Sequence, residues 1–427
     1  MDVEGRIEAT DEQGTSTQGE GKVVLSTDAI ELRPKGAVPL TISLRDVRSI
    51  ANERYAMDIT MTDGTRVKLS MLGHRYEDFV RELHRSRNEL IMRDLLMEER
   101  LRKQGVKGEL RPFRGAEGPC EVRLYDTAMV VMPLRHPLIR IRYADMEGIE
   151  ARDFTLRVAL DTGEMLTLTM LGRELDPLWK GVSEAMAELE TATQALVRDA
   201  FPGVDTSTLS KASRLLRDGR AAARWDVENV SSELWKGLER KLEAMGLGAE
   251  YRHLASLGRP EGARIGIKRS LSSEEGEYLW FMLPLLGENG NAVAMEASSG
   301  PSTGRATYFF RIAPRSKYQS MDREERIEAS ERCMSVLTAG LREINFRRQP
   351  IYLDDSKLLE PQFSKYRFSV ILIPELRELR SRFIGRVAHT SEEEWTSKVN
   401  ELLAFNTRAK DDGARWSPGS DYDELED

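Results

Sequence analysis

Two stretches of the chain alternate apolar and polar side chains in the same way. A turn divides each stretch, at Asp63-Gly64 in the first and at Gly163 in the second. The alternating apolar positions are Met57, Ile59, Met61, Val67, Leu69 and Met71 in the first stretch, and Leu156, Val158, Leu160, Leu166, Leu168 and Met170 in the second. Alternation with a period of two residues indicates strands with one buried face, and Asp-Gly favours a tight turn. Both stretches are therefore predicted to be β-hairpins.

The apolar spacing changes from strand-like to helical directly after each hairpin. These apolar residues are Tyr76, Phe79, Val80, Leu83, Leu90 and Ile91 after the first hairpin, and Leu175, Leu178, Trp179, Val182, Met186 and Leu189 after the second. Their spacing places them along one face of a helix. Before the first hairpin, short strands are predicted at Val23–Leu25, Ala29–Arg33, Leu40–Leu44 and Val47–Ala51. The pattern is thus six strands followed by an amphipathic helix.

The two patterns are copies of one another. An offset of 99 positions aligns Val23–Leu90 with Val122–Leu189 without a gap. At the junction of hairpin and helix, Gly64, Leu69, Met71, Leu72 and Gly73 match Gly163, Leu168, Met170, Leu171 and Gly172. A register that holds across strands, turns and a helix indicates a duplicated module. Leu69 and Met71 are predicted to end the buried face of the last strand, and Gly73 to turn the chain into the helix with a positive φ.

The order of elements in each copy resembles the pleckstrin-homology-like (PH-like) barrel, which has seven strands and a C-terminal helix. The resemblance covers residues 22–103 and 120–200. It implies a strongly bent sheet whose open end is plugged by the helix. It also implies binding of peptides or partner domains at a strand edge or in the groove beside that helix. Lipid-binding members carry basic residues between their first two strands, whereas Ser26–Asp28 and Tyr125–Thr127 supply none here.

The second half of the chain predicts a different architecture. Residues 201–258 have helical spacing and are predicted to form a helical segment. Residues 259–406 are predicted to form a separate α+β domain. Its strands are predicted at 278–286, 291–299, 306–314 and 349–354, and its helices at 323–344, 368–387 and 392–405, the last capped by Ser391.

The formal net charge of −8 is concentrated at the two ends of the chain. Residues 1–21 carry six acidic residues against one basic residue, and residues 407–427 carry seven against three. Both ends are polar and poor in apolar residues, which predicts disordered acidic tails. The glycine-rich residues 104–119 are predicted to be a linker between the modules. The nearly neutral body argues against nucleic acid as a partner, because nucleic-acid binding favours a basic surface.

A cytoplasmic location is expected from the cysteine content and the apolar runs. The two cysteines do not make a disulfide framework or a metal-binding motif. The N-terminus lacks the features of a secretory signal, and no apolar run reaches the roughly 18–20 residues that span a bilayer. Cys120 and Cys333 are each predicted to be a packed, unreactive thiol.

No catalytic or metal-binding motif stands out in the sequence. The five histidines lack the spacing of H-E-x-x-H, and Asp354-Asp355 lacks a further ligand at suitable spacing. Glycine-rich residues 300–307 lie between predicted strands, whereas a phosphate loop leads into a helix. We therefore expect no enzyme activity, no cofactor and no metal.

The two copies differ at a group of basic residues in the second copy. This group consists of Arg135, His136, Arg140 and Arg142. Arg140 and Arg142 alternate with apolar residues, so they are predicted to lie together on the exposed face of a strand. Their counterparts in the first copy are Thr41 and Ser43. The group is the candidate site for an anionic ligand, and it belongs to the second copy alone.

The fold class expected from these patterns is α+β, with two repeated PH-like antiparallel barrels, a helical segment and a separate α+β domain. The expected function is binding or scaffolding, in which the two modules contact protein partners. One alternative is peripheral membrane or anionic-ligand binding through the basic group. Another alternative is an enzyme activity within residues 265–406.

Overall fold

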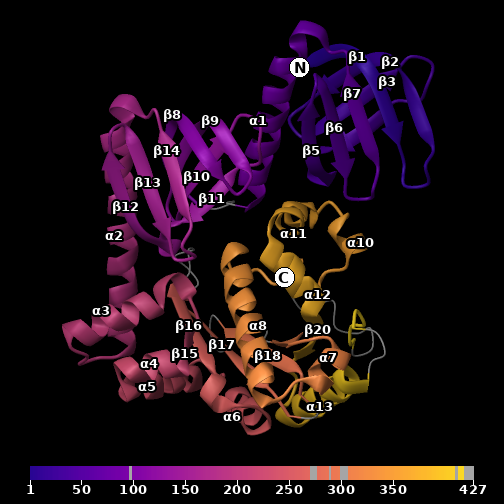
Figure 1. Ribbon diagram of the computed structural model, residues 1–427. Helices are drawn as coiled ribbons and strands as arrows, with labels where there is room; N and C mark the ends of the chain where they lie inside the picture. Colours follow the sequence, from indigo (N-terminus) through magenta and orange to yellow (C-terminus); the bar gives the residue numbers. More distant parts are fainter. Residues whose placement is uncertain (96–98, 270–276, 288–289, 299–305, 409–411, 418–427) are drawn as a thin grey trace. The chain divides into compact units, whose positions relative to one another are not determined.

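The chain divides into two compact units in the computed structural model, which describes residues 1–95, 99–269, 277–287, 290–298, 306–408 and 412–417. Unit 1 contains Met1–Met186 together with a segment from the C-terminal half, Asp355–Leu372. Unit 2 contains Ala187–Asp354 and Ile373–Asp427. Figure 1 labels the elements of both units.

Module 1 of unit 1 is a seven-stranded antiparallel sheet followed by helix α1 (Tyr76–Leu95). Its strands are β1 (Asp2–Thr10), β2 (Ser16–Leu25), β3 (Ala29–Pro34), β4 (Leu40–Ser43), β5 (Val47–Glu53), β6 (Ala56–Met61) and β7 (Arg66–Ser70). They have the spatial order β4-β3-β2-β1-β7-β6-β5. The 3-10 turn η1 (Leu44–Asp46) joins β4 to β5.

Module 2 repeats this arrangement and is followed by helix α2 (Leu175–Ala200). Its strands are β8 (Leu101–Phe113), β9 (Ala116–Tyr125), β10 (Ala128–Pro133), β11 (Ile139–Arg142), β12 (Met146–Arg152), β13 (Thr155–Leu160) and β14 (Met165–Thr169). The order β11-β10-β9-β8-β14-β13-β12 matches that of module 1, and the turn η3 (Tyr143–Asp145) corresponds to η1. The predicted duplication of a barrel-like sheet and helix is thus present.

Each module has a first strand that the hydrophobic pattern does not reveal. β1 and part of β2 lie in residues 1–21, which the composition predicts to be a disordered tail. Most of residues 104–119, the predicted linker, lie in β8 and β9. Both predictions are wrong, because β1 and β8 each pair with strands on both sides and bury apolar residues there.

A change in the repeat offset explains why these strands escape detection. Val3 pairs with Val23 in module 1, and Val106 pairs with Val122 in module 2. The partners are 20 residues apart in the first case and 16 in the second, because the β8–β9 connection is shorter. The offset between the copies is therefore 103 positions in the first strand and 99 positions from β2 onward.

The Met-Leu-Gly joint after the last strand interrupts the alternation of buried and exposed residues. Met71 and its counterpart in module 2 both have a φ of 58° and are both 72% exposed. The prediction that Met71 lies on the buried face is therefore wrong, and the next residue, Leu72, is buried instead. Leu72 packs against Gly5, where a Cβ would lie only 2.5 Å from the leucine Cδ2. Gly73 has a φ of 59°, as predicted for the turn into the helix.

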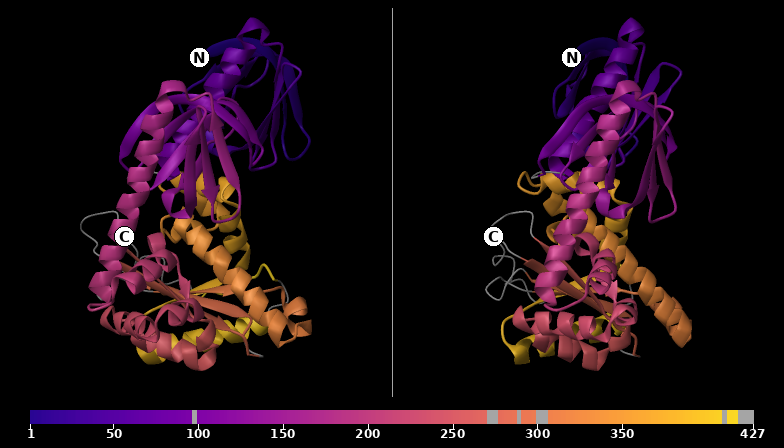
Figure 2. Two further views of the ribbon diagram at one scale, coloured as in Figure 1. Left: turned by 60° about the vertical axis from the view of Figure 1, so that its left-hand side comes forward. Right: turned by 90° about the vertical axis from the view of Figure 1, so that its left-hand side faces the viewer.

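Unit 2 is built on a six-stranded antiparallel sheet. Its strands, in spatial order, are β15 (Ala222–Ala223), β16 (Arg264–Arg269), β17 (Glu277–Leu285), β18 (Ala292–Ser298), β19 (Ala306–Arg311) and β20 (Phe383–Ala388). Nearly every residue of β17, β18 and β19 is buried, which indicates that both faces of the sheet are covered. Figure 2 shows helices on both sides of this sheet.

The helices of unit 2 fall into two layers around the sheet. One layer contains α3 (Thr206–Leu215), α4 (Arg224–Val230), α5 (Ser232–Ala244), α6 (Gly248–Leu257) and α13 (Glu392–Arg408). The helices α8 (Arg323–Glu343), α9 (Gln349–Tyr352) and α12 (Pro374–Arg382) contact β18, β20 and β19, and α7 (Arg315–Ser320) precedes α8. Residues 201–258 are therefore part of the core of the α+β unit, and their prediction as a separate helical segment is wrong.

Several predicted elements of unit 2 are confirmed and two are wrong. The predicted strands at 278–286, 291–299 and 306–314 and the helices at 323–344 and 392–405 are present within a few residues. The Ser391 hydroxyl caps the last helix by accepting a hydrogen bond from the Glu394 amide at 3.2 Å. Residues 349–354, predicted as a strand, begin with helix α9. Residues 368–387, predicted as one helix, are divided by Pro374, which starts α12, and end in β20.

Part of the C-terminal tail packs against unit 2. The Trp416 amide donates a hydrogen bond to the Ile384 carbonyl oxygen at 2.7 Å, and Arg415 forms an ion pair with Asp354 at 3.2 Å. The prediction of a disordered tail is therefore wrong for residues 407–408, which end α13, and for residues 412–417, whereas residues 409–411 and 418–427 lie outside the described residues. None of the helices in the described residues combines the length and the apolar character of a membrane span.

Candidate functional site

The basic group predicted as an anionic-ligand site does not form an exposed arginine strip. Arg140 pairs with Glu99 at 2.5 Å, and the arginine side chain is only 10% exposed. Arg142 is buried and pairs with Asp145 at 2.8 Å. The predicted exposure of both residues is wrong, because the turn η3 and the residues before β8 supply carboxylates that cover them.

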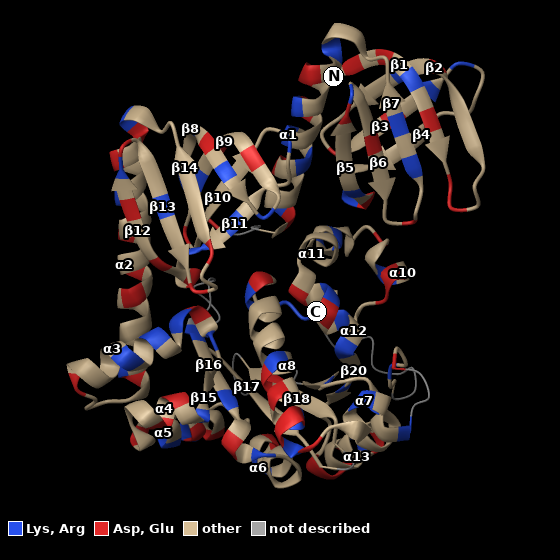
Figure 3. Cartoon of the chain, in the orientation of Figure 1, with Lys and Arg blue, Asp and Glu red and all other residues tan. Residues whose placement is uncertain are grey.

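The other two members of the basic group lie at a joint between the modules within unit 1. Arg135 pairs with Glu77 of α1, and the His136 carbonyl oxygen accepts a hydrogen bond from the Asn88 side chain at 3.0 Å. The same amide side chain accepts a hydrogen bond from the Leu138 backbone at 3.0 Å. The β10–β11 loop is therefore held by α1. Figure 3 shows that Lys and Arg are interspersed with Asp and Glu across both modules.

A segment from the C-terminal half of the chain lies against module 1. It contains α10 (Asp355–Leu358), η7 (Ser364–Tyr366) and α11 (Arg367–Leu372), and it belongs to unit 1. α11 and η7 contact α1, and α11 also contacts η1. Phe368 of α11 is 0% exposed and is part of the apolar core of module 1. This segment therefore packs against α1 and η1, and we call the surface of module 1 that it covers the α1–η1 groove.

Polar contacts surround the buried phenylalanine in the α1–η1 groove. Arg367 forms an ion pair with Asp46 of η1. The guanidinium of Arg87 lies over the Phe368 ring, 5.6 Å from its centre, and donates a hydrogen bond to the Val47 carbonyl oxygen at 2.8 Å. The α1–η1 groove thus binds a cationic side chain and an aromatic ring that are adjacent in the sequence of a short helix.

Burial shifts the ionisation of several groups on helix α1 and beside it. Desolvation lowers the pKa of Arg87 to about 10. Burial, together with the nearby charge of Arg45, also lowers the pKa of Arg367. Arg45 is itself bound by Asp94, whose side chain is almost fully buried, at 2.7 Å. Desolvation and then the charge of Arg87 lower the pKa of His84 to about 4, so this histidine is neutral near pH 7.

Module 2 has different residues at the positions that hold the segment in module 1. At the 99-position offset, Arg45, Arg87 and Asp94 correspond to Ala144, Met186 and Thr193. Asp46 corresponds to Asp145, but the acid of module 2 pairs with Arg142 of its own module. Ser43 takes the place of Arg142 in module 1. The ion-pair partner of Asp46 in η1 is therefore Arg367 of segment 355–372.

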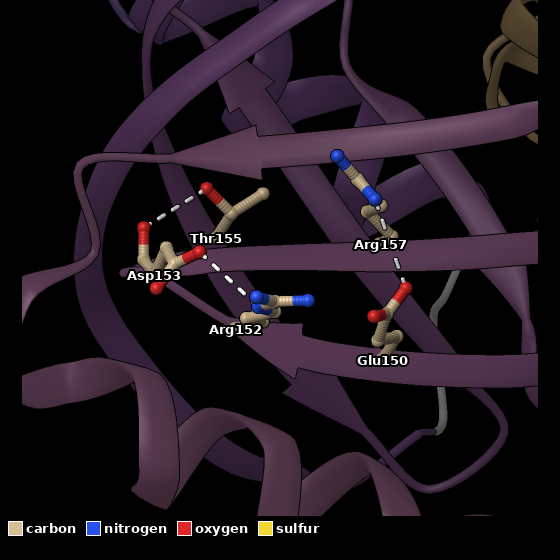
Figure 4. Close-up of a pocket in the computed structure, with 5 residues that line it drawn as sticks. All are labelled: Glu150, Arg152, Asp153, Thr155 and Arg157. Atoms are coloured by element: carbon tan, nitrogen blue, oxygen red, sulfur yellow. Dashed lines mark hydrogen bonds and ion pairs between the residues drawn. The ribbon is translucent and has the colours of Figure 1, made fainter.

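A small polar pocket lies on the β12–β13 hairpin (Figure 4). Arg152 pairs with Asp153 at 3.3 Å, and Arg157 pairs with Glu150 at 3.7 Å. The Thr155 hydroxyl donates to the Asp153 carbonyl oxygen at 3.2 Å. Two basic and two acidic side chains balance one another here, and exposed pairs of this kind contribute little energy. The pocket is best described as the surface of a hairpin turn.

A buried polar cluster in unit 2 brings together residues that are far apart in the sequence. His389 lies between two carboxylates, with Nδ1 3.1 Å from Glu250 and Nε2 2.9 Å from Glu296. The Thr307 hydroxyl donates to Glu296 at 2.7 Å and accepts a hydrogen bond from the Trp395 indole at 3.0 Å. Burial alone would lower the pKa of His389, but hydrogen bonds and charge from both glutamates raise it to about 9. The histidine is therefore cationic near pH 7.

This His389 cluster has the residue types of a catalytic or metal site, and one ligand atom from each of Glu250, Glu296 and His389 lies within 4.8 Å of the others. Thr307, His389 and Glu250 are spaced like a nucleophile, base and acid, with the Thr307 oxygen 3.3 Å from His389 Nε2. However, the Thr307 hydroxyl already donates to Glu296, and both residues are 0% exposed. A metal at Nε2 would find Glu296 as its neighbouring carboxylate, whereas Glu250 holds the opposite nitrogen. The cluster fits a protonated histidine that ties α6, β18 and the start of α13 together.

The sequence indicates one of the two features that distinguish module 1, the Ser43/Arg142 difference, and gives no indication of the other, which is segment 355–372. The difference between Ser43 and Arg142 is visible in the alignment, but its consequence lies in module 1 and not in module 2. Segment 355–372 gives no signal in the sequence, because Phe368 only begins the stretch 368–387 that is predicted as an ordinary helix, and Arg367 directly precedes that stretch. Cys120 and Cys333 are both buried, which raises the pKa of their thiols to about 11 and about 12, as expected for unreactive groups.

No family model matches this chain, and no curated protein matches it. The function must therefore be argued from the described residues themselves.

Proposed function

We propose that this chain is a non-enzymatic binding protein whose two PH-like modules contact protein partners. The module architecture supports the proposal, since each copy combines seven antiparallel strands with a C-terminal helix. The sequence predicts six strands in each copy, one fewer than the PH-like barrel has. The addition of β1 and β8 makes the resemblance to PH-like barrels closer. Fold alone does not specify function, so the proposal depends on a site.

The observation that carries the proposal is the occupied α1–η1 groove of module 1. A groove beside the C-terminal helix is where barrels of this kind are expected to take peptides. Here a helical segment that is distant in sequence from module 1 buries Phe368 in the core of the module and pairs Arg367 with Asp46. The contact has the elements of peptide recognition, with an aromatic anchor and a charge pair beside it.

The two alternatives have less support. An anionic ligand would need accessible basic side chains, but Arg140 and Arg142 are covered and paired with carboxylates. An enzyme activity in residues 265–406 would use the His389 cluster, whose threonine and Glu296 are fully buried. Protein binding therefore remains the better proposal.

Photo-crosslinking in cells that naturally make the protein tests the proposal. A photoreactive amino acid replaces Arg48 in module 1 or Glu147 in module 2, which are matched exposed positions next to η1 and η3. Lys236 of unit 2, which is also exposed, is the control position. We expect protein adducts at one or both module positions above the control. Adducts no more abundant than at Lys236, for both modules, would contradict the proposal.

A further inference from the structure

We propose that the α1–η1 groove of module 1 recognises short helical peptides with adjacent arginine and phenylalanine residues, and that segment 355–372 is its intramolecular occupant. An outside peptide of this chemistry can bind only when the segment leaves the groove. This inference rests on the proposed function and names both the class of partner and its regulation.

The recognition chemistry follows from the contacts of two consecutive residues. Phe368 contributes an aromatic ring that is completely buried in the module core, beneath the Arg87 guanidinium. Arg367 contributes a cation that pairs with Asp46. Burying an aromatic side chain supplies most of the affinity of such a contact, whereas a charge pair in a partly buried setting supplies selectivity. A peptide that lacks either residue should therefore bind poorly.

The groove is specific to module 1 because the duplicated module has lost or never acquired its polar contacts. Arg87 is replaced by Met186, which has no cation to place over an aromatic ring. Asp145 retains the acid, but Arg142 within module 2 already pairs with it. Ser43 at the Arg142 position leaves Asp46 to pair with a cation from outside the module.

The way the segment is connected makes it a tethered ligand. The chain enters the segment from Asp354 and leaves it at Ile373, and both of these residues belong to unit 2. A tethered ligand has an effective concentration on the order of millimolar when its connection is short. The apparent affinity for an outside peptide is reduced by the fraction of molecules whose groove is filled. The fraction of molecules in which segment 355–372 fills the groove therefore determines the peptide concentration needed for partner binding.

A peptide-binding experiment on the full-length chain tests the inference. The probe is a fluorescently labelled synthetic peptide with the sequence of residues 355–372, and its binding is followed by fluorescence anisotropy. We expect weak binding to the wild-type chain and at least tenfold tighter binding to the Phe368→Ala chain, in which the internal anchor is removed. Equal affinity for the two chains, or no binding to either, would overturn the inference.

Matched variants locate the binding to the groove. In the Phe368→Ala chain, the further change Asp46→Ala should weaken peptide binding about tenfold, whereas Asp145→Ala in module 2 should leave it unchanged. A peptide with Phe368→Ala should not bind. Equal effects of Asp46→Ala and Asp145→Ala would show that the groove of module 1 is not the site. If circular dichroism shows that the Phe368→Ala chain is unfolded, Arg367→Ala serves as the releasing variant with the same expected gain.

The two experiments separate this inference from the proposed function. Protein adducts in cells without peptide exchange in vitro would leave the modules as binding surfaces and reject the groove mechanism. Peptide exchange without adducts in cells would retain the groove chemistry and reject the proposed function.

Discussion

Module 1 and module 2 have the same strand order and are each followed by a helix, but the equivalent acidic residue has a different ion-pair partner in each module. In module 2, Asp145 is paired within the module by Arg142. In module 1, Ser43 replaces that arginine, and Asp46 is paired by Arg367 from residues 355–372. The difference teaches that two modules of the same fold can pair an equivalent acid either within the module or with a segment from elsewhere in the chain. A site for a partner can arise in this way.

The largest expected effect comes from removing the apolar anchor of the segment. Phe368→Ala should destabilise module 1 by about 3–5 kcal/mol, because it leaves a cavity in a fully buried position. Hydrogen exchange followed by mass spectrometry should show loss of protection in β1–α1 and little change in β8–β14. Leu359→Ala, at an exposed position of the same segment, is the control and should have no comparable effect. Equal loss of protection in both modules would contradict the assignment of Phe368 to module 1.

The next largest effect should be a difference between the two modules in how their stability depends on pH. Burial holds the pKa of His84 at about 4 in the folded state, against an ordinary value of 6.5, and the residue at this position in module 2 is Ser183. A depressed folded pKa means that stability is fully present above pH 6.5 and is lost as the pH falls toward 4. The full loss is about 3 kcal/mol for module 1.

Hydrogen exchange at pH 7 and at pH 4.5 measures this difference, with exchange rates corrected for their intrinsic pH dependence. The strands of module 1 should lose more protection than those of module 2 at the lower pH. His84→Ser, which introduces the residue of module 2, should reduce that extra loss. An unchanged acid response in the His84→Ser chain would show that another group is responsible.

Changing the ion-pair partners of the equivalent residues Asp46 and Asp145 should have a smaller effect on stability. Ser43→Arg gives Asp46 a partner within module 1 and should weaken the hold on the segment by about 1–2 kcal/mol, as expected for a competing charged hydrogen bond. Limited proteolysis should then cleave residues 355–372 faster than in the wild type. The converse change, Arg142→Ser, should destabilise module 2 by a similar amount and leave the cleavage rate of the segment unchanged. Faster cleavage in both variants would argue against a direct competition for Asp46.

The smallest effect should be shared by the modules. Gly73 and Gly172 have φ values of 59° and 52°, which favour glycine over residues with a Cβ. Gly73→Ala and Gly172→Ala should each cost about 1 kcal/mol, measured as reduced hydrogen-exchange protection of the module concerned. Similar costs would show that the joint is a common structural requirement. A large difference would indicate that one joint has acquired a further role.

Local patterns could predict the parts of the fold that depend on neighbouring residues. The hairpin around Asp63-Gly64, the stripe of α1 and the capping of α13 by Ser391 all follow from spacing and turn chemistry. The strands β1 and β8 could not be predicted, because they are largely polar and are stabilised by pairing with strands on both sides. Their repeat relation was also hidden by the change in offset from 99 to 103 positions.

The candidate site shows the same division between local and distant information. Alternation with apolar neighbours placed Arg140 and Arg142 on an exposed face, but Glu99 and Asp145 cover them there. The alternation assigns both arginines to one face of β11. It contains no information on what packs on that face. The His389 cluster was equally invisible, because its glutamates come from α6 and β18.

The sequence by itself determined that a module of strands and a helix occurs twice and that the copies differ at Ser43 and Arg142. These features are encoded in periodicity and in a constant register, both of which are properties of nearby residues. Only the tertiary structure decided that Arg367 and Phe368 lie in module 1, since roughly 300 residues separate them from Asp46 and Arg87. The physical reason is that burial and charge pairing depend on distance in space, and the alignment of two copies cannot show a third segment that only one of them binds.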